Sequence, residues 1–232
     1  MEGAVAILSR TSERDDAAEG ARELGELIGA EVVGEVQPPR EGRWDEDLPG
    51  ALPAIEAGRT AIDGGARLLV AGHCNLAMAT IPAMAALHPG LRVAWFDAHP
   101  DLNTPDTSAS GFLGGMPLAA ACGLWDPGID TEPFDPSRVH LMGARDVDPG
   151  EQDHIERFGV HYGAPADGPV FVHLDLDVLD PALMPAAFPV EDGWSWEQLE
   201  DELLALPGVV GIEITGNAVG HGARVAELLA RL

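Results

Sequence analysis

Three side chains that commonly bind metal ions lie on alternate residues of one short segment: Asp97, His99 and Asp101. The segment follows residues 91–96, an apolar run typical of a buried strand. In an extended chain, alternate side chains point to the same side, so these three can converge at the end of the strand. Two carboxylates and one imidazole suit a hard or borderline divalent cation.

A second segment repeats this arrangement. Asp175 and Asp177 directly follow the apolar run 170–174, and Asp180 comes three residues later. A single pair of this kind is more often part of a solvated loop. Two such clusters, each at the end of an apolar strand, predict a metal site.

The elements that would position these residues alternate along the chain. Runs typical of strands are residues 5–8, 31–36, 67–71, 91–96, 138–142, 170–174 and 209–214. Segments typical of helices are residues 14–28, 53–63, 76–87, 116–122, 150–158, 196–206 and 223–230. This alternation predicts an α/β fold with a mainly parallel sheet and helices on both faces. We expect a single domain, residues 1–232, with a loop at residues 37–49.

Polar clusters follow several of these strands. They are residues 72–75, 97–99, 143–148 and 175–177. Ligands of open parallel sheets bind beyond the carboxyl ends of the strands. The sequence therefore predicts the active site at this edge, with a long loop at residues 101–115 beside it.

Composition restricts the partners and the compartment. The 232 residues carry 39 acidic and 13 basic side chains, a net charge of −26. Nucleic acid and anionic membranes both require a positive surface, so neither is expected as a partner. No apolar run is long enough to span a bilayer, the start does not resemble a signal peptide, and two cysteines make no disulfide framework. These observations predict a cytoplasmic protein.

The motifs resemble those of the ureohydrolase family, which includes arginase, agmatinase and formiminoglutamase. Residues 97–105 match D-A-H-x-D-x-N-T-P, residues 110–117 match S-G-x-x-x-G-x-P, and residues 175–181 match D-x-D-x-x-D-P. Residues 145–151 look like the arginase segment that holds the amino-acid end of the substrate. The resemblance implies a three-layer α/β/α fold. It also implies paired Mn²⁺ ions that activate water for attack on a guanidine carbon, releasing urea and an amine.

The resemblance also implies roles for individual residues. Five of the six family metal ligands are matched by Asp97, His99, Asp101, Asp175 and Asp177. For the substrate, Asn103 and Ser110 match positions that bind an α-carboxylate, and Asp148 matches one that contacts the α-amino group. The family further implies a small-molecule substrate and a homo-oligomer, either a trimer or a hexamer.

The sixth ligand differs from the family pattern. The family has a histidine in G-G-D-H, whereas ungapped matching places Cys74 there, with His73 one residue earlier. Adjacent side chains diverge, so one of the two is expected to reach the metal. Mn²⁺ is expected by resemblance, and Zn²⁺ or Fe²⁺ if Cys74 coordinates, because a thiolate is a softer ligand. His173, two residues before Asp175, is expected to pack in the interior.

The groups that handle guanidine also differ. Gly114 replaces the family's proton-shuttling histidine, Phe112 replaces a nearby asparagine, and the guanidinium-binding glutamate would fall near Gly216. We expect a metal-dependent hydrolase of a linear C–N bond (amidine, ureido, formimino or amide) that is not a standard arginase. The alternatives are a catalytically weak or inactive member that binds metal or ligand or serves as a subunit, and a single-metal hydrolase similar to the deacetylases of this fold.

Overall fold

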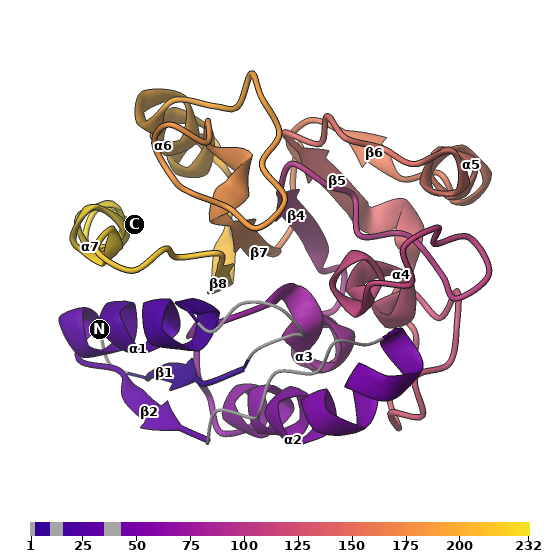
Figure 1. The fold of residues 1–232 in the computed structure, drawn as a ribbon, viewed down its shortest axis with the longest axis horizontal. Coiled ribbons are helices and arrows are strands. Elements are labelled where there is room, and N and C mark those ends of the chain that lie inside the picture. Colours follow the sequence, from indigo (N-terminus) through magenta and orange to yellow (C-terminus); the bar gives the residue numbers. More distant parts are fainter. Residues whose placement is uncertain (1–2, 10–15, 35–42) are drawn as a thin grey trace.

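The centre of the molecule is one sheet of eight parallel strands in the order β2-β1-β3-β8-β7-β4-β5-β6 (Figure 1). The computed structural model describes residues 3–9, 16–34 and 43–232. The strands are β1 (Ala4–Ile7), β2 (Glu31–Val33), β3 (Leu68–Ala71), β4 (Arg92–Phe96), β5 (Val139–Met142), β6 (His161–Tyr162), β7 (Val170–Asp175) and β8 (Val209–Thr215). The α-helices are α1 (Asp16–Ile28), α2 (Trp44–Asp63), α3 (Ala77–Leu87), α4 (Pro117–Ala121), α5 (Pro149–Phe158), α6 (Trp196–Ala205) and α7 (Gly222–Leu229).

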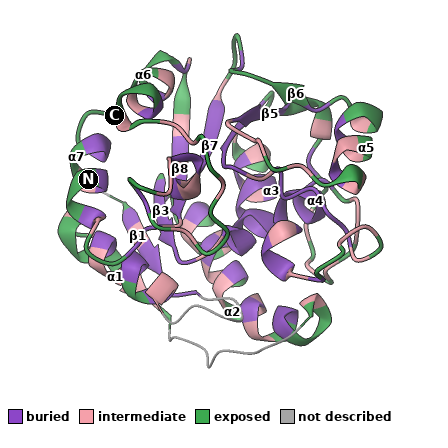
Figure 2. Cartoon of the chain, turned by 45° about the horizontal axis from the view of Figure 1, so that its top comes forward, coloured by how far each residue is buried: buried purple, intermediate pink, exposed green. Residues whose placement is uncertain are grey.

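Helices cover both faces of the sheet. On one face, α1, α6 and α7 bury residues such as Leu24, Leu199 and Val225 against the strands. On the other face, α2, α3, α4 and α5 contribute residues such as Ile62 and Met84 to a second core. Figure 2 shows buried residues concentrated on the strands and on the helix faces that meet them. This arrangement confirms the predicted three-layer α/β/α fold.

The register of the central strands aligns their carboxyl ends. Strand β7 lies between β4 and β8, with His173 opposite Trp95 on one side and Glu213 on the other. Two residues later, Asp175 lies opposite Thr215 of β8. Residues in register on parallel strands share a face of the sheet. Side chains just beyond these strands therefore meet in one place.

The predicted elements agree with the observed ones to within one residue at each described end, apart from three differences. The prediction of a loop over residues 37–49 is wrong for 44–49, which form the start of α2, while 37–42 lie outside the described residues. Acidic residues in the first turn suit a helix N-terminus, and Leu48 is buried, so packing outweighs the prolines there. Strand β2 ends at Val33, whereas the predicted strand runs to residue 36, and residues 35–36 lie outside the described ranges. The first two residues of the predicted helix 14–28 also lie outside them, and α1 begins at Asp16.

The third difference is strand β6, which the sequence did not indicate. It has only two residues, both exposed, and therefore lacks an apolar run.

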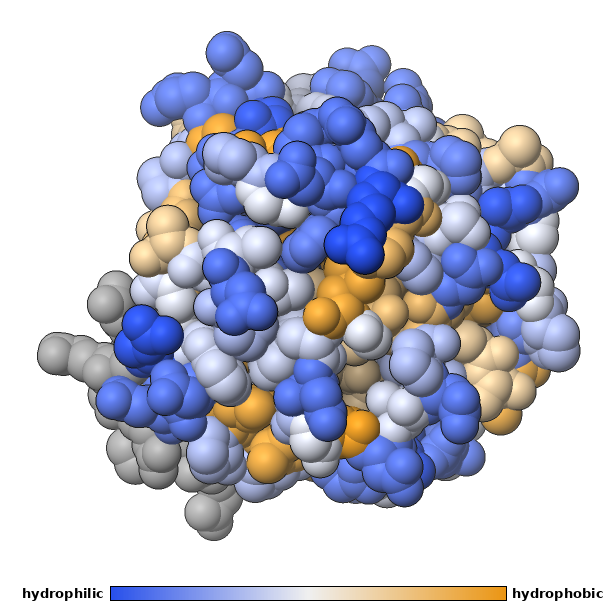
Figure 3. Space-filling view, turned by 90° about the vertical axis from the view of Figure 1, so that its right-hand side faces the viewer, coloured by the Kyte–Doolittle hydropathy of each residue, from blue (hydrophilic) through white to orange (hydrophobic). Residues whose placement is uncertain are grey.

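Figure 3 shows one side of the molecule that is largely hydrophilic, in keeping with the excess of acidic residues. Among residues 3–9, 16–34 and 43–232, no helix combines the length and the apolar character needed to cross a membrane.

Candidate metal centre and substrate pocket

A cavity of about 310 Å³ lies beyond the carboxyl ends of β3, β4, β7 and β8. Every residue predicted for the site lines it: His73, Cys74, Asp97, His99, Asp101, Asn103, Ser110, Asp148, Asp175 and Asp177. They come from segments far apart in the sequence, and the parallel sheet brings them together. The geometry thus places all of these side chains around one space.

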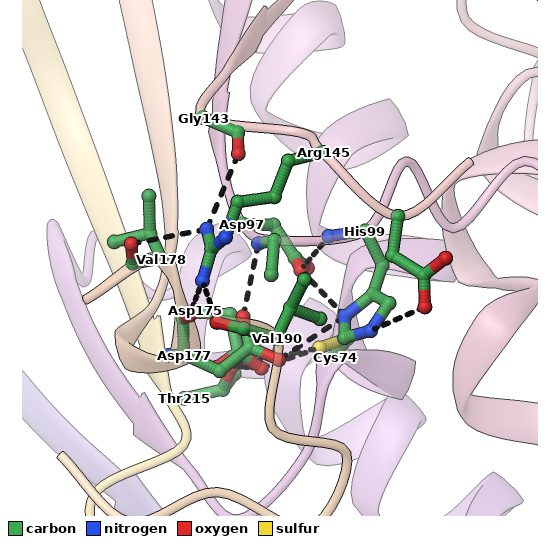
Figure 4. A network of polar contacts seen from close by, with 12 residues as sticks. Cys74, Asp97, His99, Gly143, Arg145, Asp175, Asp177, Val178, Val190 and Thr215 are labelled. Carbon is green, nitrogen blue, oxygen red and sulfur yellow. Dashed lines mark hydrogen bonds and ion pairs between the residues drawn. The ribbon is translucent and has the colours of Figure 1, made fainter. Parts of the chain in front are cut away.

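Asp97, His99 and Asp177 form the first compact group of ligand atoms (Figure 4). The His99 Nδ1 atom lies 3.1 Å from Asp177 Oδ2 and 3.3 Å from Asp97 Oδ1. Burial lowers the pKa of His99, but hydrogen bonds to the two carboxylates outweigh it and raise this pKa to about 12. The two carboxylates therefore favour a positive charge between them, which a bound cation would also supply.

The carboxylates of the site are crowded and poorly solvated. Burial, followed by the charge of neighbouring acids, raises the pKa of Asp97 and of Asp175. Burial also raises the pKa of Asp101, whose Oδ2 is buried without a hydrogen-bond partner among the described residues. For Asp177, burial raises the pKa, but the hydrogen bonds it accepts and the charge of His99 together outweigh burial and lower this pKa. Buried acids with an unpartnered oxygen fit a divalent cation, which would offset their repulsion.

Asp175 is held by three donors. Its Oδ2 accepts hydrogen bonds from the Thr215 hydroxyl at 2.8 Å and from the Cys74 thiol at 3.1 Å. Its Oδ1 accepts a hydrogen bond from the Asp177 backbone N–H at 2.9 Å. The backbone of Gly216 lies close to the Asp175 carboxylate, and an added Cβ would be 2.3 Å from Asp175 Oδ1. The Asp175 carboxylate therefore has one well-defined orientation, and residue 216 has no room for a side chain.

The side chains of Cys74 and His73 point in different directions, with His73 in extended backbone and Cys74 at the start of a short 3-10 helix. Cys74 is buried, and its Sγ faces Asp175 and the Thr215 hydroxyl. Burial, and then the nearby carboxylates, raise the pKa of the Cys74 thiol well above its usual value. The His73 ring instead lies edge-to-face with Phe112, with 6.5 Å between ring centroids. Of the two, Cys74 is the one directed at the cluster of acids.

Phe112 occupies the space in which a side chain at residue 114 would lie. A Cβ on Gly114 would come within 2.3 Å of the Phe112 ring. That ring also contacts Phe188, with 4.8 Å between centroids. The two departures from the family pattern at 112 and 114 are therefore coupled, and they replace a polar wall by an aromatic one.

Of the three residues expected to bind an amino acid, Asn103 and Asp148 contact each other at the wall of the cavity. The Asn103 side-chain amide donates to Asp148 Oδ2 at 2.9 Å. Asp148 caps α5 reciprocally with Glu151, whose other oxygen accepts from the Leu102 backbone N–H at 2.9 Å. Burial is the main cause that raises the pKa of Glu151 to about 7. Ser110 is exposed at the rim, where its Oγ accepts from the Phe112 N–H at 3.2 Å.

Sequence reasoning did not single out Glu151 or Thr215. The spacing of Asp148 and Glu151 is that of a capping box, which was a usable signal for Glu151. Thr215 ends β8 as an ordinary strand residue, so only the register with Asp175 reveals its place. Both residues orient groups of the site.

Arg145 is a third residue that sequence reasoning left without a role. Its guanidinium donates to the backbone oxygens of Gly143, Asp177, Val178 and Val190 at 2.9–3.3 Å (Figure 4). It also donates to the backbone oxygen of Glu191 at 3.2 Å. Five donors in a rigid fork suit such an array of carbonyls. Arg145 therefore ties the segment 177–191, which includes the pocket-lining Phe188, to the end of β5.

Replacement of Arg145 by methionine should loosen this segment. We expect the free energy of unfolding to fall by roughly 1–3 kcal/mol, because carbonyl groups lose their donors. Hydrogen exchange in residues 178–191 should rise at the same time. Urea denaturation and exchange mass spectrometry measure both effects. Arg138→Met, at an exposed position, is the control and should change stability by less than about 0.5 kcal/mol. Equal behaviour of the two variants would contradict the anchoring role.

Comparison with known proteins identifies relatives of this chain. The family model described as Arginase family matches residues 51–164. The N(omega)-hydroxy-L-arginine amidinohydrolase of Streptomyces lavendulae is 35% identical over 238 residues, covering 93% of this chain and 87% of that protein. The arginase of Bacillus subtilis (strain 168) is 33% identical over 172 residues, covering 62% and 58% of the two chains.

A solved structure shows the same fold. The arginase of Entamoeba histolytica, solved in complex with L-ornithine, superposes with a TM-score of 0.83 and 22% identity over 98% of this chain and 96% of that one. The extent of the similarity to the Streptomyces relative confirms the resemblance inferred from the motifs. The chain therefore belongs to the arginase family of metal-dependent hydrolases that cleave linear C–N bonds.

Proposed function

We propose that the chain is an amidinohydrolase that cleaves the hydroxyguanidine end of an α-amino acid, with N(omega)-hydroxy-L-arginine as the first candidate. One observation carries the proposal: the acidic cluster is intact, but no carboxylate extends from residues 214–217 towards the substrate space. Gly216 leaves no room for one, and Thr215 is engaged with Asp175. The Streptomyces relative named for this substrate is consistent with the choice.

The chemistry of the substrate explains why this pocket would select it. A hydroxyl group on nitrogen withdraws electrons, so a hydroxyguanidine loses its proton more readily than a guanidine. A charged guanidinium would enter without the carboxylate that offsets its desolvation. A neutral hydroxyguanidine avoids most of that cost and retains hydrogen-bonding groups. This favours the hydroxylated substrate over arginine.

We assign the metal ligands on the geometry of the acids. Asp97, His99, Asp175 and Asp177 would hold one divalent ion. Asp97, Asp101 and Asp175 would hold a second, with Cys74 rather than His73 as the additional ligand because its sulfur faces Asp175. Mn²⁺ is the first candidate, and coordination by Cys74 would favour Zn²⁺ or Fe²⁺. When bound, the ions would supply water acidic enough to act as a nucleophile near neutral pH.

The remaining residues would bind and orient the substrate. Asn103 and Ser110 would bind its α-carboxylate, and Asp148, held in place by Glu151, would contact its α-amino group. Phe112 and Phe188 would exclude bulk water from the reacting end. Addition of water to the guanidine carbon and cleavage of its bond to the side-chain nitrogen would give ornithine and hydroxyurea. These two products account for all atoms of the substrate and the water.

We also propose the setting in which the enzyme works. The 232 residues would form a single domain of a cytoplasmic homo-oligomer, a trimer or a hexamer, that takes a small-molecule substrate. The net charge of −26 supports the absence of nucleic acid and membrane partners.

Product analysis tests the proposed function. Protein reconstituted with Mn²⁺, Zn²⁺ or Fe²⁺ is incubated with N(omega)-hydroxy-L-arginine, and ornithine and hydroxyurea are measured by mass spectrometry. We expect both products in equal amounts, and neither after treatment with a chelator. Metal-loaded protein that forms no product with any of the three ions would instead support an inactive member of the family.

A further inference from the structure

His173 lies directly beneath the pocket with one ring nitrogen unpaired. The residue is fully buried on β7, and its Nδ1 is 3.0 Å from Glu213 Oε1. Its Nε2 is also buried, and it has no hydrogen-bond partner among residues 3–9, 16–34 and 43–232. A buried polar atom without a partner is costly, so such an atom calls for an explanation.

The surroundings of His173 fix the orientation of its ring. Glu213, also fully buried, accepts a hydrogen bond from the Thr80 hydroxyl at 2.6 Å. The imidazole stacks on Trp95, with 3.6 Å between ring centroids and 6° between the planes. When Nδ1–H donates to the carboxylate, the lone pair of Nε2 is left free. Histidines that bind metals usually donate the N–H of the other ring nitrogen to a carboxylate, a backbone carbonyl or a water.

The position of His173 completes a second group of ligand atoms. A ring nitrogen of His173, the Cys74 sulfur and a carboxylate oxygen of Asp97 all lie within 4.8 Å of one another. Since Glu213 engages Nδ1, Nε2 is the nitrogen available. The first group, Asp97 with His99 and Asp177, shares Asp97 with this one. Two ligand groups that meet at one carboxylate match the arrangement expected for two neighbouring ions.

We propose that His173 Nε2 is a ligand of the second divalent ion, together with Cys74 and Asp97. The inference rests on the proposed metal-dependent function and adds a histidine ligand to the second metal site. Residue 74 offers a thiol where the family has a histidine. His173 of β7 would supply an imidazole in its place. Asp101 and Asp175, assigned above to the same ion, would complete the set, and Asp175 Oδ2 lies 3.1 Å from the Cys74 sulfur. One thiolate, one imidazole and carboxylates favour Zn²⁺ at this position over Mn²⁺.

Metal content of a matched pair of variants tests the proposal. His173→Phe keeps an aromatic ring against Trp95 and removes the nitrogen. His140→Phe is the control: His140 is another buried histidine whose Nε2 has no partner in the described part of the chain, and it belongs to neither group of ligand atoms found there. After zinc loading and gel filtration, elemental analysis should give two ions per chain for the parent and for His140→Phe. It should give one for His173→Phe. Two tightly bound ions in His173→Phe would overturn the proposal.

Further measurements keep the test decisive if His173→Phe folds poorly. Anomalous diffraction from zinc-loaded parent protein should place an ion about 2.0–2.1 Å from His173 Nε2. An ion further than about 3 Å from that atom would refute the inference while leaving the proposed function standing. Parent protein that binds no ion would refute the proposed function itself. Glu213→Gln should weaken the second site roughly 10–100-fold without altering the first.

Discussion

Asp97→Ala is expected to abolish stoichiometric metal binding and to lower kcat/KM more than about a thousandfold. The residue belongs to both groups of ligand atoms, so its loss affects both metal positions. Bound ions are worth several kcal/mol of transition-state stabilisation, and each 1.4 kcal/mol is about tenfold in rate. Elemental analysis and steady-state kinetics measure the two effects.

The control for this prediction is Asp153→Ala, which removes an exposed carboxylate of α5. It should leave metal content and kcat/KM unchanged. The stability of the metal-free proteins gives a second readout. Because burial and neighbouring acids raise the pKa of Asp97, its ionised form opposes folding at neutral pH. Chelated Asp97→Ala should therefore be at least as stable as the chelated parent. Retention of two ions by Asp97→Ala would remove the basis for the site assignment.

Gly216→Ala should weaken metal binding on the order of 10–100-fold although it touches no metal itself. The added methyl would lie 2.3 Å from Asp175 Oδ1 and 3.1 Å from the backbone nitrogen of Leu176, so the carboxylate must move. Displacement of a group that orients a ligand costs about this much affinity. The residue also has a φ of +74°, which disfavours alanine by roughly 1–2 kcal/mol.

Gly220→Ala separates the two effects. Gly220 has a φ of +87°, but an added Cβ would meet no atom within 4 Å. The backbone penalty is therefore shared by both variants, whereas the contact with Asp175 is present in one. By urea denaturation we expect Gly216→Ala to lose at least as much stability as Gly220→Ala, and by calorimetry we expect the loss of metal affinity to be confined to Gly216→Ala. Equal metal affinities would show that Asp175 is not held by this contact.

The sequence predicts the site well where a local pattern determines the geometry. Alternate residues beyond a strand share a direction, and parallel strands end at one edge, so the convergence of Asp97, His99, Asp175 and Asp177 follows from spacing alone. The layer arrangement follows equally from the alternation of strands and helices. These features depend on period and order, both of which are visible in a single sequence.

Contacts between strands were less predictable. The identity of the neighbours of His173 depends on the strand order, which places β7 between β4 and β8, and no local pattern reveals that order. The same is true of Thr215 and of the carbonyl groups that surround Arg145. The helical start of α2 was missed because proline and charge suggest a loop, whereas burial of Leu48 stabilises a helix there.

The ratio of kcat/KM for N(omega)-hydroxy-L-arginine to that for L-arginine tests the central claim most directly. It should be measured on the same metal-loaded protein by release of ornithine. A charged group left without its buried partner costs about 3–5 kcal/mol, so we expect a ratio of several hundred or more in favour of the hydroxylated substrate. A ratio near one, with arginine turned over at roughly 1–10³ per second, would contradict the account. In that case another carboxylate must pair with the guanidinium.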